Sequence, residues 1–377
     1  MIAQSYNTWR AVAAQAVDRA AKSLSGVAMP LAYRDAGLAQ GKVQDAVLVR
    51  ALQQDLRCLG YLSRGIDGDF GPGTTQAVRR LQFDLMHNDG RSTRDDGPAP
   101  VALTSFNHGV VAVSGIVDAA LADSIESALA DPLVPRLPRS DDPVAANRAA
   151  LASVADIASK TAPTPFLLAT FRQESGSQHY VVPEGKQDAD TFVSIGLDHN
   201  GPSPDQVTSR GYGLGQYTLF HHPPRAEEVR DVITDPIRNV QTAFAELRDK
   251  FDHFIVGPSD TADDHQAEHP MLSLRLCRYG PDDARYMRAC KDCALAAAKV
   301  DISAGTPLYD GSTQTYGQAK YYSDPSYIGV PDRATFLCDW PYAVRRYNGG
   351  GPDSFNYQAK ILLNLLSGAS IAAGALP

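Results

Sequence analysis

The residue best placed to do chemistry is Glu174, which closes a run of helix-forming apolar residues. Phe166, Leu167 and Phe171 precede it at spacings that predict a helix over about 166–175 with one apolar face. Desolvation by these side chains and the negative end of the helix dipole both disfavour a charged carboxylate. Glu174 is therefore predicted to stay protonated near neutral pH and to act as a general acid, and a surface glutamate beside Arg172 is the plainer alternative.

Three later motifs could complete a site around this acid. The glycines of residues 211–215 let another molecule approach the main chain closely, and the Gln216 amide offers both a hydrogen-bond donor and an acceptor. Asp235-Pro236, with Asn239, opens a helix predicted to run to about residue 254. In residues 347–350 a tyrosine and an asparagine stand before two glycines, a turn that helices should flank.

The cysteines suggest a structural role outside the cytoplasm. Four of the five fall in one segment, at Cys277, Cys290, Cys293 and Cys338. An even set favours two disulfides, for which three pairings exist. A zinc site is the alternative, but zinc modules usually carry two close cysteine pairs, and only one pair is close here. We predict disulfides and neither a metal nor another cofactor.

Length and composition exclude several classes of protein. The chain has 377 residues, 44% hydrophobic and 21% charged, which fits two or more globular domains. A net charge of −8 leaves no basic surplus for binding nucleic acid or an anionic membrane. Charged residues interrupt positions 1–25, and no apolar run reaches the roughly 18 residues of a membrane span. We therefore predict synthesis in the cytoplasm without a signal peptide and no membrane span.

The periodicity of the chain predicts a mainly α-helical protein. Leucines at near-helical spacing predict a three-helix bundle, and the prolines and polar residues that follow it predict a linker. The later domain is helical apart from a short irregular or β-hairpin segment. The predicted parts are an N-terminal helix and extension (1–40), the bundle (43–130), the linker (131–144) and a larger domain (145–377) with a cysteine-bearing insert at about 272–340.

The bundle carries an ordered motif. A leucine-rich helix leads to Gly60 and Tyr61, then to an Asp-Gly-Asp-Phe-Gly-Pro turn at 67–72, and then to a helix that Thr74 or Thr75 can cap. This order resembles the peptidoglycan-binding domain of many cell-wall hydrolases, except for a long loop at 86–114. The resemblance points to Tyr61, Asp69 and Phe70 as binding-domain residues, although backbone geometry alone explains most single positions.

The motifs around Glu174 resemble the lysozyme-like domain shared by goose-type lysozymes and lytic transglycosylases. Two departures are Gly215, where a methionine is usual, and the insert that carries the cysteines. The resemblance implies that the Tyr347 hydroxyl lies near Glu174, while plain core packing of Tyr347 is the alternative. By the same resemblance, the substrate contacts are Ser175, Gly213, Leu214, Gln216, Tyr347 and Asn348.

The number of carboxylates separates two reactions. A hydrolase uses a second carboxylate as nucleophile or as base for water. The aspartates that follow Glu174 are each explained as solvated loop or turn residues, and they are Asp188, Asp190, Asp198 and Asp205. In lytic transglycosylases, the resemblance implies, one glutamate is acid and then base, while the substrate's N-acetyl group and C6 hydroxyl form a 1,6-anhydro sugar. The sequence therefore favours the transglycosylase.

Taken together, these resemblances predict a muramidase that cuts the β-1,4 bond between MurNAc and GlcNAc and is tethered to glycan strands by its bundle. The alternatives are a hydrolytic goose-type-like lysozyme and a non-catalytic peptidoglycan-binding structural protein. A cytoplasmic start requires delivery to the periplasm or wall of a target bacterium, as a phage endolysin or an interbacterial effector. An effector would have secretion machinery and an immunity protein as further partners.

Overall fold

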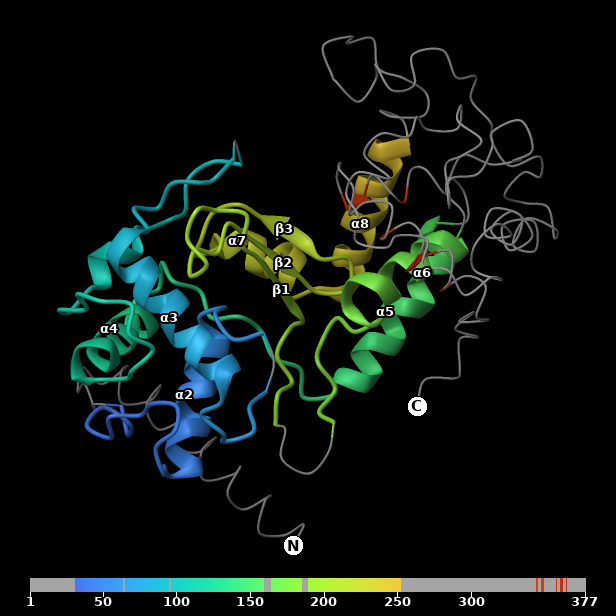
Figure 1. Cartoon of the computed structure of the whole chain (residues 1–377). Helices are drawn as coiled ribbons and strands as arrows, with labels where there is room; N and C mark the ends of the chain where they lie inside the picture. The colour runs from blue at the N-terminus through green and yellow to red at the C-terminus, as the bar shows by residue number, and fades with distance from the viewer. Residues whose placement is uncertain are drawn as a thin grey trace, which may run out of the picture. The chain divides into compact units, whose positions relative to one another are not determined.

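The computed structural model describes residues 31–63, 65–94, 96–158, 164–184 and 189–251, together with 344, 347, 348, 357, 360, 361 and 364. Within these residues there are seven α-helices and one three-stranded antiparallel sheet (Figure 1). The predicted fold class, mainly α with a short β segment, is confirmed. None of the helices described is both long enough and apolar enough to cross a bilayer. The helix predicted near the N-terminus lies outside the described residues.

By its internal contacts the chain forms two compact units. Unit 1 comprises residues 1–146 and 179–236, and unit 2 comprises residues 147–178 and 237–377. Segment 179–236, which the sequence assigns to the larger domain, thus packs with the residues of the bundle. The division into domains at 43–130 and 145–377 stays a prediction.

Three helices of unit 1 form the bundle: α2 (Ala46–Cys58), α3 (Pro72–His87) and α4 (Ala119–Ala130). Asp45 caps α2 by accepting a hydrogen bond from the Val47 N–H, and Asp118 caps α4 in the same way. Their apolar faces are buried in one cluster, to which the short η1 (Leu103–Phe106) contributes. Periodic leucines account for the three helices, and capping aspartates account for the starts of α2 and α4.

The start of α3 differs from the sequence-based expectation. The helix begins at Pro72, before either threonine, because proline at the first helical position needs no N–H partner. The Thr74 hydroxyl donates to the Asp69 carbonyl, and the Thr75 hydroxyl donates to the Gly71 carbonyl. The predicted threonine cap is therefore wrong, since both hydroxyls bind the turn before the helix.

The sheet of unit 1 has two chemically different faces. Its strands are β1 (Ile195–Asp198), β2 (Ser209–Tyr212) and β3 (Tyr217–Leu219), paired in that order. Ile195 pairs with Tyr212 on one face, which joins a buried apolar cluster. Gly196 pairs with Gly211 on the opposite face, since neighbouring residues in a strand alternate. The apolar face therefore packs inward, and the other face is built from small residues.

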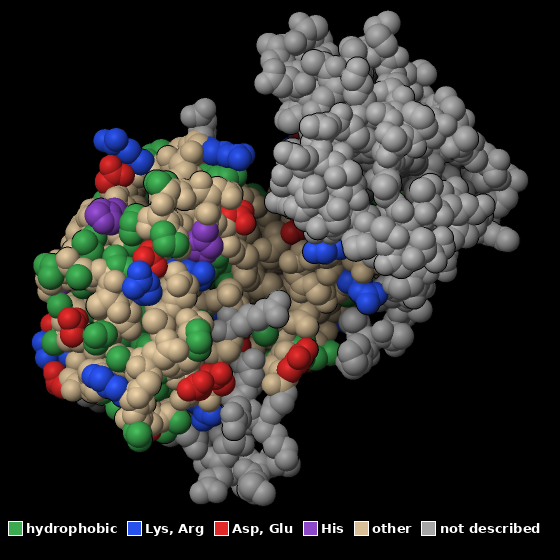
Figure 2. Space-filling view, viewed as in Figure 1, with side chains coloured by type: hydrophobic (Ala, Val, Ile, Leu, Met, Phe, Trp, Pro, Cys, Tyr) green, Lys and Arg blue, Asp and Glu red, His purple; other side chains and the backbone are tan. Residues whose placement is uncertain are grey.

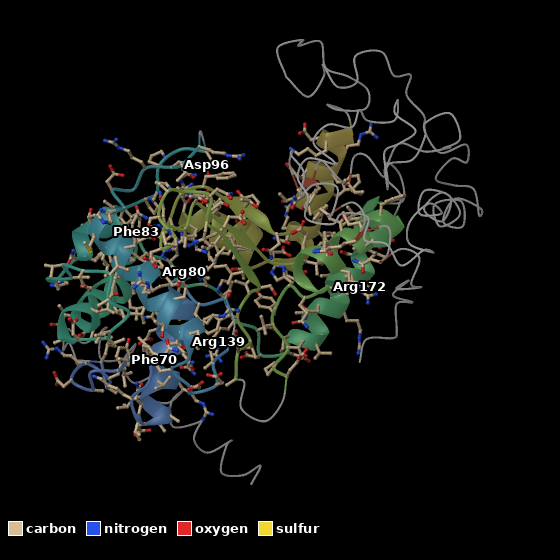
Figure 3. All side chains as sticks on the ribbon, viewed as in Figure 1. Phe70, Arg80, Phe83, Asp96, Arg139 and Arg172 are labelled. Carbon is tan, nitrogen blue, oxygen red and sulfur yellow. The ribbon has the colours of Figure 1, made fainter. Side chains whose placement is uncertain are left out.

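The segment predicted as a linker is packed within unit 1. Leu137 is buried, and its N–H donates to the Cys58 carbonyl at 2.9 Å. The Val193 N–H donates to the Pro138 carbonyl at 3.0 Å. The guanidinium of Arg139, which is labelled in Figure 3, lies over the Phe192 ring, 4.9 Å from its centre. No helix lies in residues 131–142, and a helix begins at Pro143, inside the predicted linker 131–144. These contacts attach the segment to residues that precede it and to residues that follow it in the chain.

Unit 2 holds the helix that ends at the candidate acid. It contains most of α5 (Pro143–Ala158), all of α6 (Thr164–Ser175) and most of α8 (Pro236–Phe251). The start of α8 directly after Asp235 confirms the predicted helix opening. In unit 1, α7 (Ala226–Glu228) continues into a π-helical turn, η2 (Val229–Ile233), ahead of α8. Residues 344, 347, 357, 360, 361 and 364 are also helical.

Candidate functional site

Glu174 lies in the last turn of α6 in unit 2. Phe166, Leu167 and Phe171 on the same helix are fully buried, which confirms the predicted apolar face. The helix ends because Gly176 and Ser177 both adopt left-handed backbone, with φ of 64° and 66°. The Glu174 side chain is only partly buried. The carboxylate therefore lies beside a packed apolar helix and keeps some access to solvent.

Two tyrosines lie close to this carboxylate. The Tyr357 hydroxyl donates a hydrogen bond to Glu174 Oε1. Burial and the negative charge of Glu174 raise the pKa of Tyr357 well above its usual value, and the same two causes raise the pKa of Tyr347. Both hydroxyls thus stay protonated, and the Tyr357 hydroxyl is a donor to Glu174. Asn348 follows Tyr347 at an exposed turn position.

Sequence reasoning missed Tyr357. Its helical segment packs on α6, because Ile361 is fully buried and the Asn364 amide donates to the Ala169 carbonyl at 3.5 Å. Residues 357, 361 and 364 share one face of a helix, and this spacing was the available signal. The partner of Tyr357 lies 183 residues away, so no local pattern could reveal it.

The turn at residues 213–216 belongs to unit 1 and is tightly held. Gly213 and Gln216 have φ of 74° and 53°, and the Gln216 side-chain amide donates to the Gly213 carbonyl at 2.8 Å. The Leu214 N–H donates to His179 Nδ1 at 3.3 Å. Nε2 of the same ring lies 3.0 Å from the Ile233 carbonyl, so Nε2 carries the hydrogen. Burial lowers the pKa of His179 to about 4, which keeps this arrangement neutral.

The glycines beside this turn are used differently from the prediction. A Cβ atom on Gly196 would lie 2.4 Å from Gln216 Oε1, and one on Gly211 would lie 2.7 Å from it. At Gly211, the space that we assigned to an approaching molecule is therefore filled by the Gln216 side chain. The glycines let this side chain lie flat on the sheet.

The aspartates that could serve as the second carboxylate of a hydrolase are mostly bound to neighbouring side chains. Asp190 is fully buried and accepts a 2.8 Å hydrogen bond from Arg57, so it is not a solvated loop residue. It does form a turn, as the other interpretation predicted, because its Oδ1 accepts from the Phe192 N–H at 3.0 Å. Asp205 pairs with Arg79 at 2.7 Å, and the hydrogen bond from Arg79 lowers the pKa of its carboxyl. Asp198 is exposed and accepts from the Ser209 hydroxyl at 2.9 Å. Asp188 lies outside the described residues.

The predicted residues of the peptidoglycan-binding domain divide by exposure. Tyr61 is buried and donates to Asp84 Oδ2 at 2.7 Å, and Phe70 is part of the bundle core. Asp69 is exposed on the turn between α2 and α3. Tyr61 and Phe70 therefore stabilise the bundle, while a direct contact of any of the three with ligand stays a prediction. Acidic and basic side chains are intermixed on the described face of unit 1 (Figure 2).

Possible metal ligands and the reactivity of Cys58 can be judged in the part of the chain that the structure describes. That part contains no group of three or more histidine, cysteine or carboxylate side chains arranged for a metal ion. Cys58 is a free thiol, and burial raises its pKa to about 12, which leaves it unreactive. The predicted disulfide residues Cys277, Cys290, Cys293 and Cys338 lie outside the described residues.

Comparison with known proteins identifies one region of the chain. Residues 46–85, which span α2, the turn after it and most of α3, match the family model described as "Putative peptidoglycan binding domain". No match was found among curated proteins or among solved structures. The peptidoglycan-binding domain expected from the sequence motif is therefore present, and peptidoglycan binding is the activity it brings. The matched family says nothing about residues 86–377.

Proposed function

We propose that the protein is a lytic transglycosylase that cuts the β-1,4 bond between MurNAc and GlcNAc, with Glu174 as acid and then base. The observation that carries the proposal is the hydrogen bond from Tyr357 to Glu174 at the end of α6. Tyr347 lies close enough for the charge of Glu174 to raise the pKa of its hydroxyl. The peptidoglycan-binding domain at residues 46–85 supplies the substrate class. Cleavage of a glycosidic bond requires a carboxylic acid that is held in position and donates a proton to the leaving oxygen.

The proposed reaction uses the two oxygens of Glu174 differently. Because Oε1 accepts the hydrogen bond from Tyr357, the transferable proton resides on Oε2. Glu174 gives this proton to the glycosidic oxygen as the bond to C1 of MurNAc breaks, and the N-acetyl oxygen of the substrate stabilises the positive charge at C1. The Glu174 carboxylate then takes the proton of the C6 hydroxyl, whose oxygen bonds to C1 and closes the 1,6-anhydro ring.

The state of the aspartates supports this reaction over hydrolysis. Asp190 and Asp205 are each bound to an arginine of the bundle, so neither is available to activate a water molecule. The hydrolytic alternative would then depend on Asp198 or on Asp188. The enzyme would act in the periplasm or wall of a target bacterium, delivered as an interbacterial effector or a phage endolysin. Secretion machinery and an immunity protein would be its partners in the first case.

The test is to digest purified peptidoglycan and read the released fragments by mass spectrometry. We expect anhydro-ended products from the wild type and from Glu184→Gln, a matched control at an exposed glutamate. Glu174→Gln should release none. Reducing ends from the wild type would establish a hydrolase and direct the search to Asp198→Asn. If the wild type binds sacculi without releasing fragments, the protein is a non-catalytic binder and the proposal fails.

Delivery has a separate test. The wild type and Glu174→Gln are produced in a Gram-negative host, each with and without a periplasmic export signal. Lysis is expected only for the exported wild type, because peptidoglycan lies outside the inner membrane. Lysis by the protein without the export signal would show that it reaches peptidoglycan unaided and would contradict the proposal that other machinery delivers it.

A further inference from the structure

Three ion pairs join the bundle to segment 179–236 inside unit 1. They connect α2 to the stretch before β1, α3 to the loop after β1, and α3 to β2. The pairs are Arg57 with Asp190 (2.8 Å), Arg79 with Asp205 (2.7 Å) and Arg210 with Asp84 (3.2 Å). Both side chains of the first pair are 0% exposed. Buried charges of this kind are tolerated only while paired, so the two segments depend on each other.

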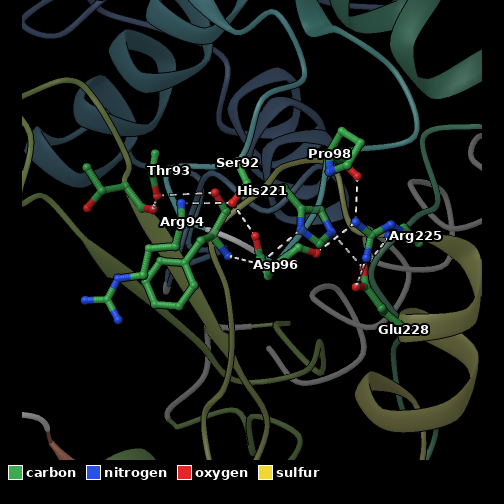
Figure 4. A network of polar contacts seen from close by, with 10 residues as sticks. Ser92, Thr93, Arg94, Asp96, Pro98, His221, Arg225 and Glu228 are labelled. Carbon is green, nitrogen blue, oxygen red and sulfur yellow. Dashed lines mark hydrogen bonds and ion pairs between the residues drawn. The ribbon is translucent and has the colours of Figure 1, made fainter. Parts of the chain in front are cut away.

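The long loop after α3, which departs from the usual peptidoglycan-binding domain, makes a fourth connection. Asp96 in this loop accepts hydrogen bonds from the Phe220 N–H at 2.7 Å and lies 3.1 Å from His221 Nδ1 (Figure 4). Arg225 donates to the carbonyls of Asp96 and Pro98. Asp96 and Pro98 of the loop are thus bound to the chain that follows β3, so this loop helps to hold the two segments together.

The bundle and the Gln216 side chain lie on opposite faces of the sheet. On the apolar face, Arg210 Nε donates to the Gly60 carbonyl at 3.2 Å, and a Cβ on Gly60 would lie 3.6 Å from Ile195. On the other face, Gln216 covers Gly196, the residue next to Ile195 in β1. The sheet therefore lies between the bundle and the Gln216 side chain and contacts both.

We infer that the peptidoglycan-binding domain and the Gln216 turn form one rigid body that holds a single glycan strand in a fixed register. A domain on a mobile linker would raise local concentration without setting a register. The packed residues 131–142, the three ion pairs and the bound loop leave no such freedom within unit 1. The role of Gln216 as a glycan contact rests on the proposed function, whereas peptidoglycan binding by residues 46–85 does not.

A protection experiment tests the register without requiring catalysis. Glu174→Gln protein is bound to uncrosslinked glycan strands, unbound sugar is removed with an added lysozyme, and the protected fragments are sized by mass spectrometry. If the binding domain and the Gln216 turn form one rigid body, all protected glycan fragments should have the same length. Gln216→Ala in the same background should shorten this fragment and weaken strand binding up to about tenfold, since one or two polar contacts are lost. Asn200→Ala, at an exposed loop position, is the matched control and should change neither.

Rigidity is measured independently by spin-label distances in the full chain. Labels are attached through p-acetylphenylalanine at Ala130 of α4 and at Asn200, both exposed, which spares the five cysteines. A single narrow distance, unchanged by glycan strands, is expected. A broad distance distribution, two separate protected lengths, or a protected length insensitive to Gln216→Ala would each overturn the inference. If the wild type cleaves nothing but one protected length depends on Gln216, the proposed catalysis fails and the single register stands.

Discussion

At the scale of single residues, the hydrogen bond from Tyr357 to Glu174 has a measurable effect on the proposed acid. A donor to a carboxylate favours its charged form, and a hydrogen bond to a charged group contributes about 1.5–3 kcal/mol. Tyr357→Phe removes the donor and should raise the pKa of Glu174. Because the acid must be protonated, activity falls as pH rises through this pKa. We expect the alkaline limb of the pH profile to move up by about one pH unit, with a lower maximal rate.

Two comparisons make this result specific. Tyr217→Phe alters a partly buried tyrosine of unit 1 and should leave the profile in place. A merely structural role for Tyr357 would lower the amount of active protein without moving the pH limb. An unmoved limb together with normal folding would contradict the proposed part of Tyr357 in setting the acid.

His179 makes the stability of unit 1 depend on pH. Its pKa is about 4 in the folded protein and 6.5 in an ordinary environment, so the unfolded chain binds the proton first as pH falls. The stabilising contribution is complete above pH 6.5 and is lost between pH 6.5 and 4, by about 3 kcal/mol. Burial also lowers the pKa of His222, which adds to the loss in the wild type. Urea unfolding at pH 7 and pH 4.5 should therefore show a loss that includes the His179 contribution in the wild type and a smaller loss in His179→Gln. His108→Gln, at an exposed site, should behave like the wild type, and equal losses in all three would refute the assignment.

At the scale of elements, the sheet offers a way to move Gln216 without replacing it. In Gly196→Ala the new methyl group would lie 2.4 Å from Gln216 Oε1, so the side chain must leave the sheet. The far end of a glutamine moves easily, and we expect a change in unfolding free energy below about 1 kcal/mol. Glycan affinity should fall as much as in Gln216→Ala, measured by strand binding. The control is Gly73→Ala in α3, where the new methyl group has open space, and it should leave binding intact. Unchanged binding in Gly196→Ala would show that glycan binding does not depend on the position of the Gln216 side chain.

The elements also show what sequence reasoning can reach. The starts of α2 and α4 follow from capping aspartates, and the start of α8 from Asp235-Pro236, because these signals are local. The start of α3 was missed because proline at the first position outweighed two available threonine caps. The pairing of Asp190 with Arg57 spans 133 residues, and that of Asp205 with Arg79 spans 126. Such contacts depend on packing, which periodicity does not encode.

At the scale of the whole molecule, the packing of segment 179–236 with the bundle changes what a binding domain means here. A tethered module could be removed without harm to its neighbour. Removing this bundle would leave Asp190 and Arg210 without these partners and would expose the apolar cluster that contains Leu137 and Ile195. The binding domain and the sheet that carries Gln216 therefore depend on each other for folding.

This interdependence predicts that α2 and β2 unfold together. Asp190→Asn leaves Arg57 buried without its counter-charge, which should cost about 3–5 kcal/mol, whereas Arg57→Met with Asp190→Leu replaces the pair by apolar side chains and should recover most of the loss. Native-state hydrogen exchange measures both segments at once. The slowest amides of α2 and β2 should share one opening free energy in the wild type, and both should fall by the same amount in Asp190→Asn. If only the amides of β2 exchanged faster, the bundle would fold independently, and the coupling of binding domain to sheet would be limited to surface contact.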